Sequence, residues 1–110
     1  MDKFDKFYAL SAPIRREIIN LLSDGEQLTA TAIADKFQVS PPAISQHLKV
    51  LLNSSLVQMH KQAQQRIYEL NPAAILELET WASQITTQLT KVGRLAENQL
   101  PNIIPKKVSE

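Results

Sequence analysis

Hydrophobic residues in the first part of the chain recur every three or four positions, the spacing of a helix that buries one face. Residues 3–10 are expected to form a short amphipathic helix that breaks near Ser11. A second helix is expected over residues 13–22, where Pro13 suits the first turn and Gly25 the left-handed C-terminal end. Its apolar face consists of Ile14, Ile18, Leu21 and Leu22.

A third helix is predicted after Thr29, a favourable N-cap, and residues 38–39 then form a tight turn. A fourth helix is predicted over about residues 40–53, with Ser40 as its N-cap and two prolines in its first turn, where their missing N–H groups cost nothing. At about 100° per residue, Ile44, Leu48 and Leu51 lie on the inner face with Leu52 at its edge, whereas Pro42, Ala43, Gln46 and Lys49 point outward.

Two alternating segments follow, residues 56–61 and 66–70, and the polar residues 62–65 separate them. This pattern predicts a β-hairpin, which we expect to be the only sheet. Asn71 and Pro72 then mark the start of a long helix. Its apolar residues repeat at alternating steps of three and four: Ile75, Leu78, Ala82, Ile85, Leu89, Val92 and Ala96.

Such a seam is typical of a coiled-coil-like interface and exceeds what one small domain buries within itself, so we infer a partner helix, most simply a second copy. Trp81 is expected in this interface or in the core rather than in a ligand pocket. The helix ends either at Gly93 or near residue 100, and residues 101–110 are expected to be a flexible tail.

Charge changes this picture more through its distribution than through its sum. The net charge is only +1, yet no Asp or Glu occurs from Lys36 to Tyr68. The basic residues and histidines of this acid-free segment are Lys36, His47, Lys49, His60, Lys61 and Arg66. The gap is either a chance feature of a mixed polar surface or a face kept free of groups that repel phosphate.

The chain has no cysteine, which excludes disulfides, thiol nucleophiles and thiolate metal sites. The N-terminal sequence lacks the apolar run of a signal peptide, and no stretch has the roughly 20 apolar residues of a membrane span. We therefore expect a soluble, cytoplasmic protein with no membrane partner. The sequence does not favour an enzyme, since Ser45, His47 and His60 have no carboxylate in their segment and no glycine-rich phosphate loop is present.

The order of helices followed by a hairpin is that of a winged helix-turn-helix, whose second motif helix enters the major groove. The segments ALSAPIRREIINLL, LTATAIADKFQVSPPAISQHLKVLLNSSLV and RIYELNP resemble the ArsR/SmtB family of bacterial winged-helix repressors. The likeness covers residue 9 to about residue 100, and its most specific piece is the S-x-H-L run from Ser45 to Leu48. We expect a mainly α winged helix (α+β) over residues 1–100, with four helices, a two-stranded wing over about 56–70 and a long dimerisation helix over about 72–99 that acts with residues 3–10.

The resemblance implies a homodimer that presents two recognition helices to a partly palindromic DNA operator. It places the DNA contacts at Ser40, Pro42, Ala43, Ser45, Gln46, His47, Lys49, Lys61, Gln64 and Arg66. The dimer interface would contain Phe4, Phe7, Ile75, Leu78, Trp81, Ala82, Ile85, Leu89 and Val92. His47 lies at the flank of the recognition helix, where it either packs beside Leu51 or Val50 or contacts DNA.

Two positions depart from the family pattern. Many members have Gly where this chain has Gln38, which indicates either a strained left-handed residue or a different turn. Many wings carry Gly-Arg at the tip, where this chain has Ala63-Gln64, so the wing is expected to supply less electrostatic affinity.

Family members that sense metals do so through cysteines or through Asp and His ligands on the last helix, and this chain has neither set. Glu77 and Glu79 lie about 200° apart on that helix, too far around to share one ion. No metal site or cofactor is expected. The Ile-Tyr-x-Leu-Asn-Pro junction between strand and helix, followed by Trp81 on a long last helix, looks most similar to the metal-free branch that includes the SdpR-like repressors. The hypothesis is therefore a metal-independent DNA-binding repressor. The alternatives are a winged-helix module that docks proteins and a metal-responsive sensor with an unrecognised site.

Overall fold

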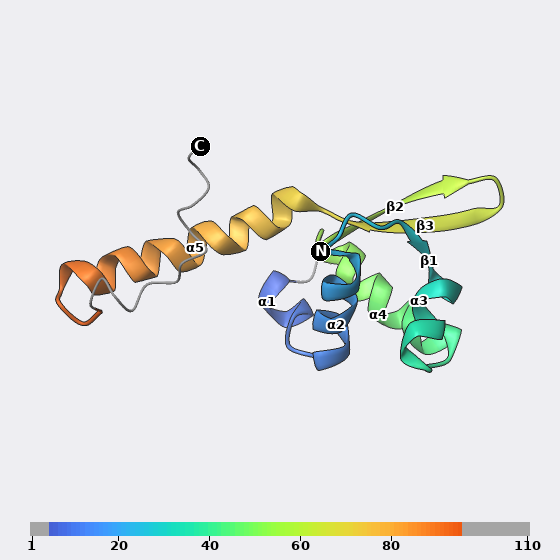
Figure 1. Cartoon of the computed structure of the whole chain (residues 1–110), viewed down its shortest axis with the longest axis horizontal. Helices are drawn as coiled ribbons and strands as arrows, with labels where there is room; N and C mark the ends of the chain where they lie inside the picture. Colours follow the sequence, from blue (N-terminus) through green and yellow to red (C-terminus); the bar gives the residue numbers. More distant parts are fainter. Residues whose placement is uncertain (1–4, 96–110) are drawn as a thin grey trace. The chain divides into compact units, whose positions relative to one another are not determined.

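The structure is a computed structural model that describes residues 5–95, and these residues include five helices and three strands (Figure 1). The elements are α1 (Lys6–Ala9), α2 (Pro13–Leu22), β1 (Leu28–Thr29), α3 (Ala30–Phe37), α4 (Pro41–Asn53), β2 (Val57–Gln62), β3 (Gln65–Leu70) and α5 (Pro72–Lys91). They fall into two compact units, one up to Ile75 and the other from Leu76 on. The first unit contains the expected helix-turn-helix and hairpin.

The ends of the helices are set by the residues that the sequence places there. Asp5 caps α1 by accepting a hydrogen bond from the backbone N–H of Phe7 at 3.0 Å. Thr29 caps α3 and Ser40 caps α4, each by accepting from the N–H three residues on, at 3.1 and 3.3 Å. Each of these side chains satisfies one of the backbone donors that the first turn of a helix leaves without a partner.

The turn between α3 and α4 has the left-handed residue that the sequence raised as one of two possibilities. Gln38 has φ 55° and ψ 42°, a conformation that favours glycine. Its N–H and that of Val39 both bond back to the carbonyl of Ala34. The turn is therefore of the ordinary helix-terminating kind, and the missing glycine leaves strain rather than a different geometry.

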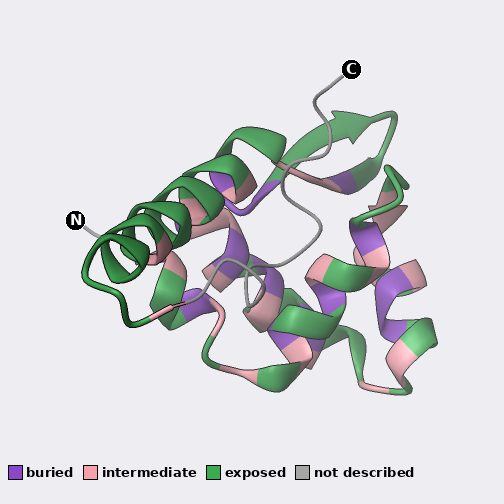
Figure 2. Cartoon of the chain, turned by 60° about the vertical axis from the view of Figure 1, so that its left-hand side comes forward, coloured by how far each residue is buried: buried purple, intermediate pink, exposed green. Residues whose placement is uncertain are grey.

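The core of the first unit forms where α4 crosses the other helices and the sheet. Ile44, Leu48 and Leu51 of α4 are fully buried, as the helical spacing predicts, and Leu52 is half-buried. They join Ile18, Leu22, Ile33 and Leu56, which are also fully buried. In Figure 2, purple marks the buried stretches of the helices in the first unit. Because one face of α4 is fixed in this core, its other face has a defined orientation toward solvent.

The sheet has three strands in the order β1-β3-β2, all antiparallel. The predicted hairpin is confirmed, with Gln62 paired to Gln65 at its tip. The third strand, β1, was not foreseen, because two residues are too short to show an alternating pattern. β2 also does not alternate, since Val57 is its only buried residue. The tip of the hairpin extends beyond α3 and α4 (Figure 1), and most of the hairpin is exposed (Figure 2).

Helix α5 begins at the predicted place and ends at the earlier of the two expected positions. Asn71 accepts from the N–H of Ala73 at 3.2 Å, and its amide nitrogen donates to the carbonyl of Ser55 at 2.8 Å. The last helical residue is Lys91, and Gly93 follows with φ 77°. Among the earlier expectations, Phe4, Ala96 and the tail at 101–110 lie outside the described residues.

Candidate nucleic-acid interface

The outward face of α4 is the first part of the candidate interface. Pro42, Ser45, Gln46 and Lys49 are exposed, and Ala43 is half-buried. The hydroxyl oxygen of Ser40, also exposed, accepts the capping hydrogen bond of the helix, and its O–H remains to donate elsewhere. The face therefore presents short or uncharged side chains and a single cation at Lys49, which allows another molecule to approach the backbone closely.

The tip of the hairpin is the second part. Lys61 and Arg66 are directly opposite each other on β2 and β3, and both are exposed, as is Gln64 at the tip. Like charges placed opposite each other across a sheet destabilise it, and an anion between them removes that cost. Ala63 has φ 58°, so the glycine that the family pattern places here would relieve strain.

The acid-free segment covers α4, β2 and most of β3, so it unites the two parts of the interface. The acids that border the segment are Asp35 on α3 and Glu69 on β3. A side-chain oxygen of Glu69 accepts from the side-chain amide of Gln27 at 2.8 Å. Helix α4, which corresponds to the expected recognition helix, and the hairpin of β2 and β3, which corresponds to the wing, thus carry cations without a carboxylate within that segment. Such a surface suits the phosphate backbone of a nucleic acid.

Beneath the recognition helix lies an arginine that the sequence pattern had not singled out as functional. Arg15 of α2 is only 7% exposed. Its Nε donates to the carbonyl of Ala9 at 2.7 Å and its Nη2 to that of Tyr8 at 3.3 Å, and its guanidinium lies 5.3 Å from the centre of the Tyr8 ring. The positive charge thus meets the C-terminal carbonyls of α1 and an aromatic face, both of which stabilise a cation.

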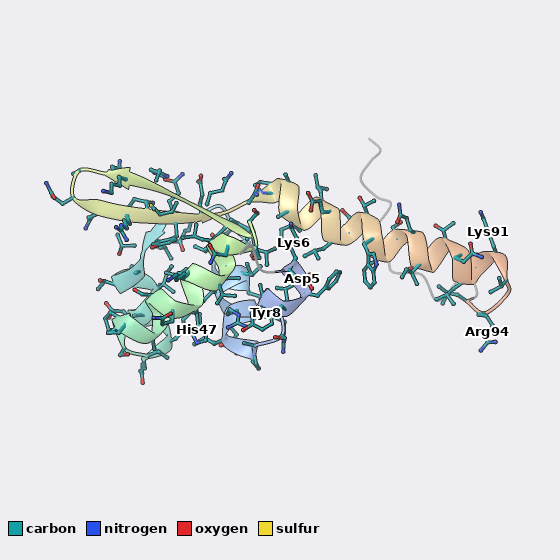
Figure 3. The ribbon with its side chains drawn as sticks, turned by 180° about the vertical axis from the view of Figure 1, so that it is seen from behind. Asp5, Lys6, Tyr8, His47, Lys91 and Arg94 are labelled. Atoms are coloured by element: carbon teal, nitrogen blue, oxygen red, sulfur yellow. The ribbon has the colours of Figure 1, made fainter. Side chains whose placement is uncertain are left out.

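The remaining contact of Arg15 is with the recognition helix. Its Nη1 lies 3.2 Å from Nδ1 of His47, a half-buried residue on α4. Figure 3 shows the side chain of His47 on α4 and that of Tyr8 on α1. Burial lowers the pKa of His47, and the nearby charge of Arg15 lowers it further. Both effects favour the neutral form of His47.

A signal for Arg15 was present in the sequence. Arg15, Ile18 and Leu22 are the three buried residues of α2, spaced three and four positions apart. The centre of the buried face lies along this line, whereas Ile14 and Leu21, which were expected on it, are half-buried. A charged residue on a buried stripe requires polar partners, and that requirement points to a specific contact.

The second unit carries an exposed apolar stripe. On α5, Trp81 is 50% exposed, Ile85 44%, Leu89 40% and Val92 57%. Ala82 is also exposed, whereas Ile75 and Leu78 are half-buried. On α1, Phe7 is exposed as well. Water-exposed apolar side chains at helical spacing are typical of a surface that another helix covers.

Within residues 5–95, no three His, Cys, Asp or Glu side chains lie together in a group able to hold a metal ion. In the same part of the chain, no helix combines the length and the apolar character needed to cross a membrane.

Residues 12–59 match the model of the arsR family of bacterial regulatory proteins, a segment that contains the whole helix-turn-helix. The chain is 37% identical over 75 residues to the transcriptional repressor SdpR of Bacillus subtilis (strain 168), which covers 68% of this chain and 82% of that protein. The chain belongs to the ArsR family. The family likeness inferred from the sequence is therefore confirmed, and ArsR-family proteins are DNA-binding transcriptional regulators rather than enzymes.

Two other ArsR-type relatives extend this result. The arsenical resistance operon repressor of Staphylococcus xylosus is 44% identical over 62 residues, which are 56% of this chain and 59% of that one. The crystal structure of an ArsR family transcriptional regulator superposes with a TM-score of 0.69 at 26% identity, over 76% of this chain and 86% of the other. The predicted winged-helix fold with its long last helix is thus confirmed.

Proposed function

We propose that this ArsR-family protein is a homodimeric repressor that reads a partly palindromic operator in double-stranded DNA without a metal-sensing site. The observation that carries the proposal is the pairing of the exposed face of α4 with a hairpin whose outer part is free of acids. The buried face of α4 is fixed by Ile44, Leu48 and Leu51, so the helix can enter a major groove as a rigid body.

Base recognition falls to the outward residues of α4. Gln46 hydrogen-bonds with the N6 and N7 positions of adenine, and Lys49 reaches guanine or a phosphate. Ser45 bonds to either kind of base, and Ala43 or Pro42 contacts a thymine methyl group. Ser40 and His47 complete the set at the start and at the flank of the helix.

The wing contributes phosphate contacts rather than base contacts. Lys61 and Arg66 supply two cations at directly opposed positions, and Gln64 adds a polar group at the tip. Each phosphate neutralised by such a cation releases counterions, which gives affinity without sequence preference.

A second copy of the chain is the occupant proposed for the exposed stripe of α5. Trp81, Ile85, Leu89 and Val92 repeat at the spacing of a helix pair, and Ile75, Leu78 and Ala82 extend the apolar residues of that helix. Phe7 of α1 is proposed as a further member of the interface. A two-fold dimer presents two copies of α4, so its half-sites are expected about 10 base pairs apart or at a multiple of that distance.

The likeness to an arsenical resistance repressor favours a second candidate, a metal-responsive sensor. Against it, the chain contains no cysteine and only two histidines. His47 already uses Nδ1 for Arg15, and a zinc-class site needs several such ligands. The metal-independent repressor is therefore preferred.

Selection of bound duplexes from a random DNA pool, with chelator-treated protein at near-physiological salt, tests this function. Enrichment of a two-fold symmetric sequence supports a metal-independent dimeric reader. Enrichment that appears only after a metal is added supports the sensor. If only random sequences are recovered with and without added metal, the result would contradict the metal-independent repressor and the metal-responsive sensor alike. It would then favour a winged helix that docks proteins.

A further inference from the structure

We propose that Arg15 is the positioning residue of the recognition helix: it holds the imidazole of His47 in one tautomer and directs its Nε2–H outward, as a neutral donor to duplex DNA. This inference rests on the proposed function and deepens it. Neither the family likeness nor the spacing of residues assigns such a role to an arginine on α2.

The tautomer follows from the chemistry of the pair. A guanidinium has five N–H donors and no acceptor, so the contact between Nη1 and Nδ1 at 3.2 Å requires a lone pair on Nδ1. A neutral imidazole with a lone pair on Nδ1 carries its proton on Nε2. Arg15 thereby selects one of two tautomers that are otherwise close in free energy.

Arg15 is itself held firmly enough to impose this choice. The backbone carbonyls of Tyr8 and Ala9 fix two of its nitrogens, which leaves Nη1 to face His47. The residue is nearly buried, so its orientation does not average over many rotamers. The guanidinium of Arg15, a residue of α2, thus joins the end of α1 to α4. All three helices belong to the first unit.

The other ring nitrogen faces outward. Nε2 of His47 has no hydrogen-bond partner among residues 5–95, and in that part of the chain no buried side-chain nitrogen or oxygen lacks one. Nε2 must therefore reach solvent. His47 follows Ala43 by one helical turn and so borders the face proposed to meet DNA. A phosphate oxygen or the N7 or O6 atom of guanine is the acceptor that fits such a donor.

A histidine that merely packs against the core is the competing interpretation, and paired substitutions separate the two. In His47→Gln, the amide nitrogen replaces Nε2 as the outward donor. In His47→Asn, the amide oxygen still accepts from Arg15, but the outward donor is removed. We expect His47→Asn to bind a selected duplex about tenfold more weakly than the wild type, and His47→Gln, which keeps the outward donor but loses the contact with Arg15, to bind with an affinity between the two. Equal binding by the wild type and a folded His47→Asn variant would overturn the DNA contact.

Arg15 is tested by a double-mutant cycle with Arg15→Lys and His47→Ala, measured by binding to the same duplex. Because Lys lacks the planar fork, Arg15→Lys should weaken binding when His47 is present and have little effect when it is absent. An equal loss of affinity in both backgrounds would show that Arg15 acts through general stability and not through His47. Thermal unfolding of each variant identifies any that fail to fold.

The tautomer is measured directly by nitrogen NMR of the wild-type protein without DNA, with exposed His60 as the internal reference. We expect Nδ1 of His47 to have the shift of a lone-pair nitrogen and Nε2 that of an N–H. The reverse assignment would overturn the positioning role even if DNA binding is intact. Failure of the wild type to select any duplex refutes the proposed function and the DNA contact together, and the NMR result still decides what Arg15 does.

Discussion

The guanidinium of Arg15 donates to Nδ1 of His47 across 3.2 Å and thereby joins α2 to the recognition helix. One buried charge thus contacts the end of α1, an aromatic ring and α4. The orientation of α4 therefore depends on a polar contact as well as on the apolar core. We therefore expect the helix to respond to pH and to single substitutions far from its outward face.

Folding stability should fall as the pH drops below the ordinary pKa of histidine. Desolvation, and then the charge of Arg15, lowers the pKa of His47 in the folded state, so the unfolded chain binds this proton more readily. The contribution is complete above about pH 6.5, the pKa of an unperturbed histidine, and is lost as the pH falls from there toward the lower folded value. Urea unfolding at several pH values gives the free energy of unfolding as a function of pH. The change in this free energy that His47 causes below about pH 6.5 should be absent in His47→Gln. A wild-type pH dependence that persists in this variant would assign the effect to other groups.

Replacing Gln38 with glycine should stabilise the protein by about 1 kcal/mol, because glycine adopts a φ of 55° without strain. The matched control is Gln88→Gly, in the regular part of α5, which should cost about 1 kcal/mol. Thermal unfolding of both variants measures the effect. A destabilised Gln38→Gly protein would show that the glutamine side chain compensates for its strained backbone.

The double substitution Ile85→Glu and Leu89→Glu should convert the proposed dimer into monomers, because it places charges on the exposed stripe of α5. Thr87→Glu is the control, since this exposed residue lies about 200° around the helix from both positions. Sedimentation equilibrium gives the mass of each protein. A dimeric double variant would show that the stripe is not the interface.

Removing the two cations of the wing, Lys61 and Arg66, by alanine substitution should weaken binding to every duplex alike. The dependence of log affinity on log salt should become shallower by about one unit for each phosphate that is no longer neutralised. Without DNA, the variant should be slightly more stable than the wild type, because two like charges no longer oppose each other. A change in sequence preference would instead indicate that the wing reads bases.

The sequence predicted the elements that local patterns determine. Ser40 and Asn71 mark the starts of α4 and α5 because capping and proline placement involve only neighbouring residues. The buried residues of α4 followed in the same way from helical spacing. By contrast, β1 owes its existence to a partner strand distant in the sequence, which no two-residue pattern reveals.

The candidate site was predictable only in part. The exposed positions of α4, among them Gln46 and Lys49, followed from the face opposite the core. The contact between Arg15 and His47 joins residues 32 positions apart, and its geometry depends on how α1, α2 and α4 pack. The spacing of Arg15 from Ile18 and Leu22 fits the buried face of α2, but spacing alone does not identify the partner of a buried charge.

The most direct test of the central claim, that the outward face of α4 reads base sequence, is competition between a selected duplex and its scrambled form. Wild-type protein and the double variant Gln46→Ala and Lys49→Ala are compared. A second double variant, Gln88→Ala and Lys91→Ala, removes the same residue types at the same spacing from exposed positions of α5.

Each good base contact is worth about 1–3 kcal/mol, so the α4 variant should lose its preference for the selected duplex while it keeps weak, salt-sensitive binding. The α5 variant should bind like the wild type. An unchanged preference in a folded α4 variant would contradict the assignment of base recognition to this face.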